Sequence, residues 1–200
     1  LSRMPSTPAT VIDASTLIDV AAAKAEAAAA GDGPALRAAD LGERAALAAN
    51  EGRPDDARRD LMIALAGSDD PRLLFLGFQF HFRTAVAPGV GAEARAAGLD
   101  EAERLVRRRL RTAESAENSP HLGRAHTNLG LVLQYRGESS HAEAETHYRR
   151  AIEADRRIGH EEGIARDLGN LGNFYESTGA PKKKPPAVSP TTMSAPISFW

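Results

Sequence analysis

Cysteine is absent from this chain of 200 residues. Disulfide frameworks and thiolate metal sites are therefore excluded, and the absence fits a reducing compartment. No run of about 18 apolar residues occurs, so the sequence predicts no membrane-spanning helix. The N-terminal residues lack a basic segment followed by an apolar run, so no signal peptide is expected. Together these absences favour the cytoplasm.

Aromatic residues make up only 5% of the chain, although hydrophobic residues make up 42%, and this balance is typical of alanine-rich helix packing. The net charge is −2, but residues 181–200 contain Lys182–Lys184 and no acidic residue, so residues 1–180 carry −5. Because nucleic-acid binding requires a basic surface, a mildly acidic body argues against a nucleic-acid partner.

One stripe of residues recurs three times along the chain, at intervals of 45 and 42 residues. In each copy a small residue is followed by a large apolar residue four positions later and by another after four more, which places all three on one helix face. A stripe repeated at such an interval indicates a stacked helical array. The copies are Ala57-Leu61-Leu65, Ala102-Val106-Leu110 and Ala144-Tyr148-Ile152.

A second element, Leu-Gly within a helix, repeats as well. Leu129-Gly130 recurs 42 residues later as Leu171-Gly172, and Leu76-Gly77 is a looser copy. Glycine within a helix costs about 1 kcal/mol relative to alanine. Its recurrence at one place predicts that the following helix approaches closely there.

At these residues the chain resembles the tetratricopeptide repeat (TPR) family. The resemblance implies an all-α fold, a right-handed superhelical array of antiparallel helix pairs, or α-solenoid. The minimal family period is about 34 residues, and the longer period here is similar to the arrays of kinesin light chain and of bacterial regulatory proteins. The residues that carry the resemblance are Leu129, Gly130, Leu133, Ala144, Tyr148 and Ala151.

The chain departs from the repeat at several positions. Arg109 stands where Ala64 and Ala151 stand in the other second helices, and Ala45 lies near the glycine position of the first unit. The last unit has no second helix, because five prolines follow Gly179 and cannot fit one regular helix.

We expect a flexible arm over residues 1–12, a TPR-like helical repeat domain over 13–179 and a disordered tail over 180–200. The terminal residues 197–200 either fold back over the last helix or mark a cut domain boundary or an altered reading frame. Segment 85–98, rich in glycine, is expected to lengthen a turn, either as a surface insertion or as a lid. The expected helices are 13–30, 34–51, 54–66, 71–84, 99–116, 120–136, 139–158 and 162–178.

Polar residues on the first helices of the last two units form the candidate binding site. The resemblance implies that first helices line a concave groove, and some TPR domains hold an acidic chaperone C-terminus at matching positions, although the usual lysines are absent here. Arginine binds carboxylates and asparagine binds peptide backbone, so these side chains either bind a peptide or are ordinary solvated residues. They are Arg124, Asn128, Arg166, Asn170 and Asn173.

Two further clusters have alternative interpretations. Phe75, Phe78 and Phe82 share one helix face, which indicates core packing or an apolar pocket for a ligand side chain. Arg107–Arg109 and Arg111 point in most directions around a helix, which indicates a solvated face or a patch for nucleic acid or lipid.

No phosphate loop and no His-Glu-x-x-His motif occurs, and His147 with Glu143 would make a poor metal site. We therefore expect no catalytic residue, no metal and no cofactor; a hydrolase or transferase with residues 85–98 as its lid would lack a nucleophile.

The sequence predicts a non-catalytic scaffold that binds a protein or peptide partner in its concave groove, without nucleic acid or membrane. The alternative is the ligand-sensing or autoinhibitory region of a bacterial signalling or transcription regulator.

Overall fold

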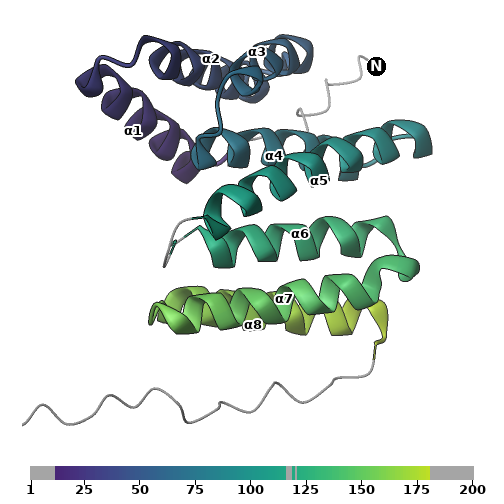
Figure 1. The fold of residues 1–200 in the computed structure, drawn as a ribbon. Coiled ribbons are helices and arrows are strands. Elements are labelled where there is room, and N and C mark those ends of the chain that lie inside the picture. The colour runs from purple at the N-terminus through teal and green to yellow at the C-terminus, as the bar shows by residue number, and fades with distance from the viewer. Residues whose placement is uncertain (1–11, 116–118, 120, 181–200) are drawn as a thin grey trace, which may run out of the picture.

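The computed structural model describes residues 12–115, 119 and 121–180, and every regular element within them is a helix (Figure 1). The expectation of an all-α protein is thus confirmed. None of the helices in this described part is both long and apolar enough to cross a bilayer. The elements are α1 (Ala14–Ala30), α2 (Gly33–Asn50), α3 (Pro54–Ala66), α4 (Pro71–Val86), α5 (Ala92–Glu114), α6 (Leu122–Arg136), the short η1 (Glu138–Ser140), α7 (His141–Arg157) and α8 (Glu161–Thr178).

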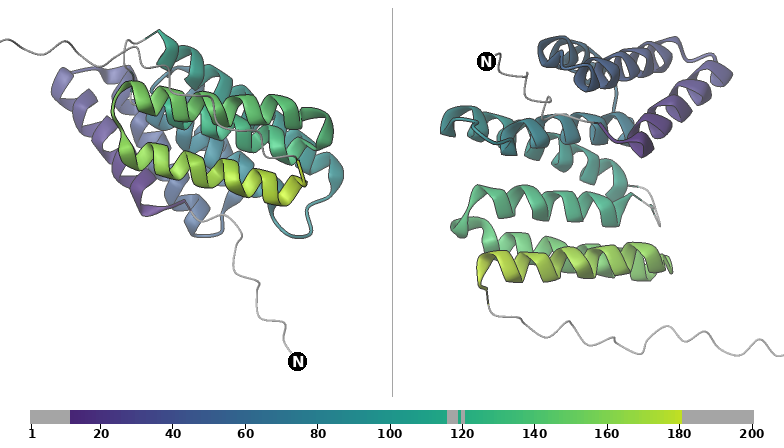
Figure 2. Two further views of the ribbon diagram at one scale, coloured as in Figure 1. Left: turned by 90° about the horizontal axis from the view of Figure 1, so that it is seen from below. Right: turned by 180° about the vertical axis from the view of Figure 1, so that it is seen from behind.

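Each helix from α4 to α8 contacts the next, and α1 to α3 lie together at the other end of the molecule (Figures 1 and 2). Helix α6 also contacts α8, and α1 contacts α4 as well as α2. The helix starts follow from the sequence, because Asp13, Asp32 and Asp70 each accept a backbone N–H of the first turn. Glycine in the left-handed conformation ends α1 and α8, at Gly31 and Gly179.

Helix α4 takes part in two buried hydrophobic clusters. One face contributes Phe78 and Phe82 to the cluster formed with α5 to α8. The other contributes Leu73, Leu74, Leu76 and Phe80 to the cluster formed with α1, α2 and α3. Phe80 lies off the Phe75-Phe78-Phe82 stripe and yet is only 1% exposed, because this helix is covered on two sides.

The expected long turn over residues 85–98 is wrong. Helix α4 continues to Val86 and α5 begins at Ala92, so only a short connection separates them. Gly98 is inside α5, where a Cβ atom would lie 2.7 Å from Cβ of Ala85 and 3.2 Å from the carbonyl oxygen of His81. This glycine permits the close crossing of α4 and α5, and the segment does not form a loop that covers a groove.

The recurring glycines mark close helix contacts, with one exception. A Cβ on Gly130 would lie 3.0 Å from Cε1 of Tyr148 on α7, and one on Gly77 would lie 2.7 Å from Cδ1 of Leu65. The third copy, Gly172, has no described neighbour within 4 Å of such an atom. Residues 181–200, which would have to form the second helix of the last unit, lie outside the described part of the chain, so the predicted lack of that helix stays a prediction.

In α2, Gly42 makes a close contact with α4, whereas Ala45, near the expected glycine position of the first unit, is 1% exposed. A Cβ on Gly42 would lie 2.5 Å from Cδ2 of Leu73 on α4. Leu41-Gly42 is a further Leu-Gly pair within a helix, which the repeat interval alone does not identify.

The expected arm and tail mostly lie outside the described residues, which exclude 1–11 and 181–200. The proposed fold-back of residues 197–200 lies there too. Ile12, expected in the arm, is 2% exposed, and its backbone N–H donates to Oδ1 of Asn50 at 2.6 Å while its carbonyl accepts from Nδ2 at 3.2 Å.

Gly130→Leu should destabilise the protein by about 1–3 kcal/mol, because the buried Tyr148 ring leaves no room for a side chain. The matched control Gly172→Leu should be neutral or more stable by roughly 0.5–1 kcal/mol, since helix propensity improves and the space is open. Chemical denaturation of both variants measures the difference. A Gly130→Leu protein as stable as the control would contradict the close approach of α7.

Candidate functional site

The five predicted site residues lie on adjoining helices. Arg124 and Asn128 belong to α6, and Arg166, Asn170 and Asn173 belong to α8. Two hydrogen bonds hold these helices side by side: the Thr127 hydroxyl donates to Oδ1 of Asp167 at 2.8 Å, and Nε2 of Gln134 donates to Oγ of Ser177 at 2.9 Å.

Three asparagines of this set have different exposures. Asn128 is buried, Asn170 is half-buried and Asn173 is exposed. Nδ2 of Asn128 is enclosed and has no hydrogen-bond partner among the described residues. A buried amide donor without a partner is costly, so this atom departs from the usual arrangement of buried polar groups.

Arg166 is already committed within the chain. Its Nη2 donates to Oδ2 of Asp155 at 3.1 Å and its Nε to Oδ1 of Asp167 at 3.1 Å. Both carboxylate side chains are almost fully buried, and burial raises the pKa of Asp167 above its usual range. The first role of Arg166 is therefore to neutralise two buried acids.

The sequence analysis missed Asp155 as a partner of Arg166, although glycines give a signal for it. A Cβ atom on Gly123 would lie 2.1 Å from Oδ1 of Asp155, and one on Gly163 would lie 1.7 Å from Oδ2 of the same carboxylate. The carboxylate thus fills the space that side chains at these two positions would otherwise occupy, which explains glycine in the first turns of α6 and α8.

Arg124 lies over the ring of Phe75, with 5.5 Å between its Cζ and the ring centroid. No ion pair joins Arg124 to another residue of the described part of the chain, so its guanidinium group remains able to bind an anion. Phe75 also stacks on Phe78, at 5.9 Å between ring centroids, and Phe78 on Phe82 at 5.5 Å. The aromatic stripe is therefore mainly core, with Phe75 at its edge.

The arginine run on α5 does not form a single surface patch. Arg107 donates to Glu103 at 2.7 Å and to Glu143 at 2.9 Å. Arg108 pairs with Asp69 and donates to two backbone carbonyls, whereas Arg109 is buried. Arg107 with its two glutamate partners and the exposed Arg111 fit the solvated face, whereas Arg108 and Arg109 serve separate contacts.

A buried pair of imidazoles joins α6 to α7. Nδ1 of His126 and Nδ1 of His147 are 3.0 Å apart. Burial and the neighbouring His147 lower the pKa of His126 to about 4, and burial followed by Arg150 lowers that of His147. No group of three or more metal-ligating side chains suited to a metal ion occurs in the described ranges.

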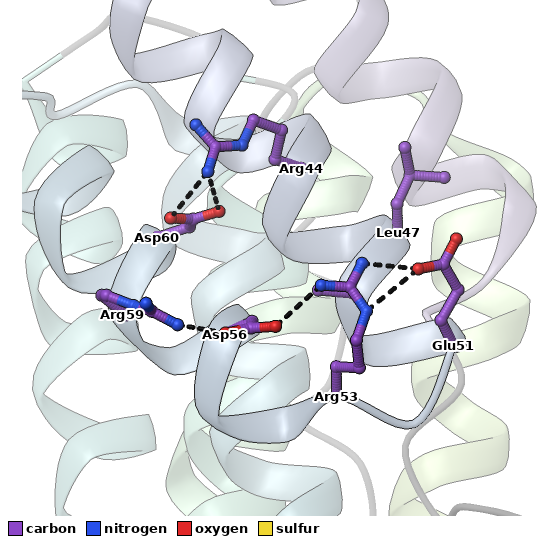
Figure 3. A pocket seen from close by; sticks show the side chains of 8 residues that line it. Arg44, Leu47, Glu51, Arg53, Asp56, Arg59 and Asp60 are labelled. Carbon is purple, nitrogen blue, oxygen red and sulfur yellow. Dashed lines mark hydrogen bonds and ion pairs between the residues drawn. The ribbon is translucent and has the colours of Figure 1, made fainter.

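A hollow between α2 and α3 is lined by charged residues, as Figure 3 shows. Arg53 donates to Glu51 and Asp56, Arg59 pairs with Asp56, and Arg44 pairs with Asp60 (Figure 3). Every guanidinium in this hollow is therefore matched by a carboxylate of the same hollow, and the site offers little to a charged ligand.

Arg166→Ala should lower the free energy of unfolding by roughly 2–3 kcal/mol, because Asp155 and Asp167 would lose their guanidinium partner while buried. The control Arg150→Ala removes an exposed arginine from α7 and should change stability by less than about 0.5 kcal/mol. Urea unfolding at pH 7 compares them. Equal stability of the two variants would contradict the assigned role.

Stability should fall on acidification, because His126 has a folded-state pKa near 4 against 6.5 when unfolded. Between these values the unfolded chain binds more protons, so about 2 kcal/mol should be lost between pH 7 and pH 5. His126→Gln should flatten this dependence, whereas the control His141→Gln should retain it. Urea titrations at both pH values measure it, and an unchanged slope in His126→Gln would contradict this prediction.

No protein-family model, curated protein or solved structure matches this chain. The TPR family therefore remains a resemblance carried by the residues named above. On α6 the side-chain amide of Asn128 has no partner among the described residues, whereas Arg166 on α8 is paired within the chain.

Proposed function

We propose that the chain is a TPR-like superhelical array and acts as a non-catalytic scaffold that binds a peptide or a helix along α6 and α8. The succession of contacting helices and the recurring close-contact glycines support this architecture. The observation that carries the function is the enclosed Nδ2 of Asn128, which has no described partner, beside Arg124, which forms no ion pair with the described residues. Both lie four residues apart on α6, so they share a face.

Binding would use donors that the fold holds in place before the ligand arrives. Because a buried donor without a partner costs roughly 1–3 kcal/mol, a peptide carbonyl that accepts from Asn128 recovers that energy on binding. Asn170 and Asn173 extend the same kind of donor along α8, at half-buried and exposed positions. Rigid helices leave most of the ordering cost to the ligand.

The two arginines of the site have different roles. Arg124 is free to bind a carboxylate, since it makes no ion pair with the described residues, whereas Arg166 is held by Asp155 and Asp167. Arg166 would then position α8 against α7 and reach a ligand only through its remaining N–H groups.

Peptides selected from an immobilised peptide array should bind the full chain with an affinity that Arg124→Ala weakens by about tenfold or more, as expected for the loss of a charge-assisted hydrogen bond. Asn170→Ala should weaken it less, and the control Arg150→Ala should leave it unchanged. Fluorescence anisotropy measures all four proteins. If Arg124→Ala and Arg150→Ala bind alike, the α6–α8 surface is not the binding site.

Small-angle scattering with and without the selected peptide separates the scaffold from the sensing alternative. A scaffold should keep its scattering profile on binding. A changed profile would instead favour a region whose curvature responds to its ligand.

A further inference from the structure

Arg109 is the one charged residue at a position that the repeat otherwise gives to alanine. Ala64 on α3 and Ala151 on α7 are 1% and 0% exposed, and Arg109 on α5 is 2% exposed. Its Nε and Nη1 are enclosed without a hydrogen-bond partner, and it makes no ion pair with any described residue. A buried guanidinium is normally paired, so this one departs from the usual arrangement.

Arg109 shares the ring of Phe75 with a second guanidinium. Its Cζ is 5.0 Å from the ring centroid, and Cζ of Arg124 is 5.5 Å from the same centroid. Burial first, and then the charge of Arg124, lower the pKa of Arg109 to about 10, which leaves it charged at neutral pH. Two cations from α5 and α6 thus meet on one aromatic ring of α4.

Acidic residues nearby do not neutralise this pair. Asp70 is committed to Arg72, at 2.7 Å between Oδ2 and Nη2, and Asp19 forms no ion pair with Arg109. Both acids act on Arg109 only at longer range. Among the described residues, none forms an ion pair with the two guanidinium groups that meet at the junction of α4, α5 and α6.

We propose that Arg109 and Arg124 form a carboxylate-binding site at the junction of α4, α5 and α6, with Phe75 as its floor. A carboxylate is planar and accepts two parallel N–H groups of a guanidinium fork, so it would satisfy the enclosed nitrogens of Arg109 and separate the two like charges.

This site goes beyond the peptide-binding surface proposed above, because its central residue, Arg109, lies on α5 and its ligand is defined by its negative charge. The carboxylate has two possible sources, a free carboxylic acid or an acidic side chain of a bound peptide. The chemistry of recognition is the same for both, and the experiment distinguishes them.

Thermal melts of the full chain in sodium succinate, sodium phosphate and sodium chloride at matched ionic strength test the site. Succinate should raise Tm by about 2–4 °C over chloride, as expected for a modest binding energy in a chain of this size. Arg109→Met should melt at or above the wild-type Tm in chloride, because an apolar side chain replaces an unpaired buried charge. It should also lose the succinate effect, which the control Arg150→Met should keep.

Three results of these melts would overturn the proposal. If succinate does not change the wild-type Tm, the proposed site does not exist. If phosphate raises Tm more than succinate does, the ligand is not a carboxylate. An Arg109→Met protein that melts well below wild type and retains the succinate shift shows a structural role for Arg109 instead.

Glu117 lies outside the described residues, between α5 and α6, and provides an internal control. Glu117→Gln should leave the succinate shift unchanged, and its effect on Tm should add to that of Arg109→Met. A succinate shift that grows in Glu117→Gln would show that the chain supplies its own carboxylate, and the proposal would fall.

A blocked peptide of alternating alanine and glutamate, compared with its glutamine counterpart, identifies the source. If the carboxylate belongs to a peptide, the glutamate form should bind at least about tenfold more tightly by anisotropy, and Arg109→Met should abolish the difference. Equal binding of the two peptides, with the succinate shift intact, assigns the site to a free acid and leaves the peptide-binding proposal to its own test.

Discussion

The structure depends on α4 being buried on two sides. Most surface helices bury one stripe and expose the other, but α4 supplies Phe78 and Phe82 to one cluster and Leu73 and Phe80 to another. The two halves of the molecule consequently pack on the same helix, without needing a separate interface. Changes in the packing of α1 to α3 are therefore expected to affect α5 and α6 through α4. Both arginines of the inferred anion site, Arg109 and Arg124, lie over the ring of Phe75 on this same helix.

Three arginines show how different the roles of similar side chains can be in this fold. Arg166 neutralises two buried acids, Arg124 rests on an aromatic ring without an ion pair, and Arg109 is enclosed without a partner. An unpaired buried charge weakens the free protein, whereas a paired one is largely compensated. Binding chemistry is therefore best sought where the chain itself has not satisfied its cations, which is at the junction of α4, α5 and α6.

The sequence predicted the helices and their buried faces because a repeated stripe depends on spacing alone. The prediction fails at the start of α5: the sequence suggests a turn at Gly98, whereas this glycine lies inside the helix, where α5 crosses α4 closely. It also overlooked Leu41-Gly42, since that copy does not keep the interval of about 42 residues. For the site, spacing placed Arg124 and Arg166 on equivalent faces but could not show that Asp155 and Asp167 hold Arg166. Nor could it show that His126 meets His147, because polar partners from different helices follow no period.

Gly172 has the position of Gly130 but lacks a described neighbour. The space beside Gly130 that the Tyr148 ring fills is thus repeated beside Gly172, where no described residue fills it. A further helix in the register of α7 could be received there without moving the helices already present. Lengthening the array by one helix would then be an addition beside α8 that leaves the packing of the existing core unchanged.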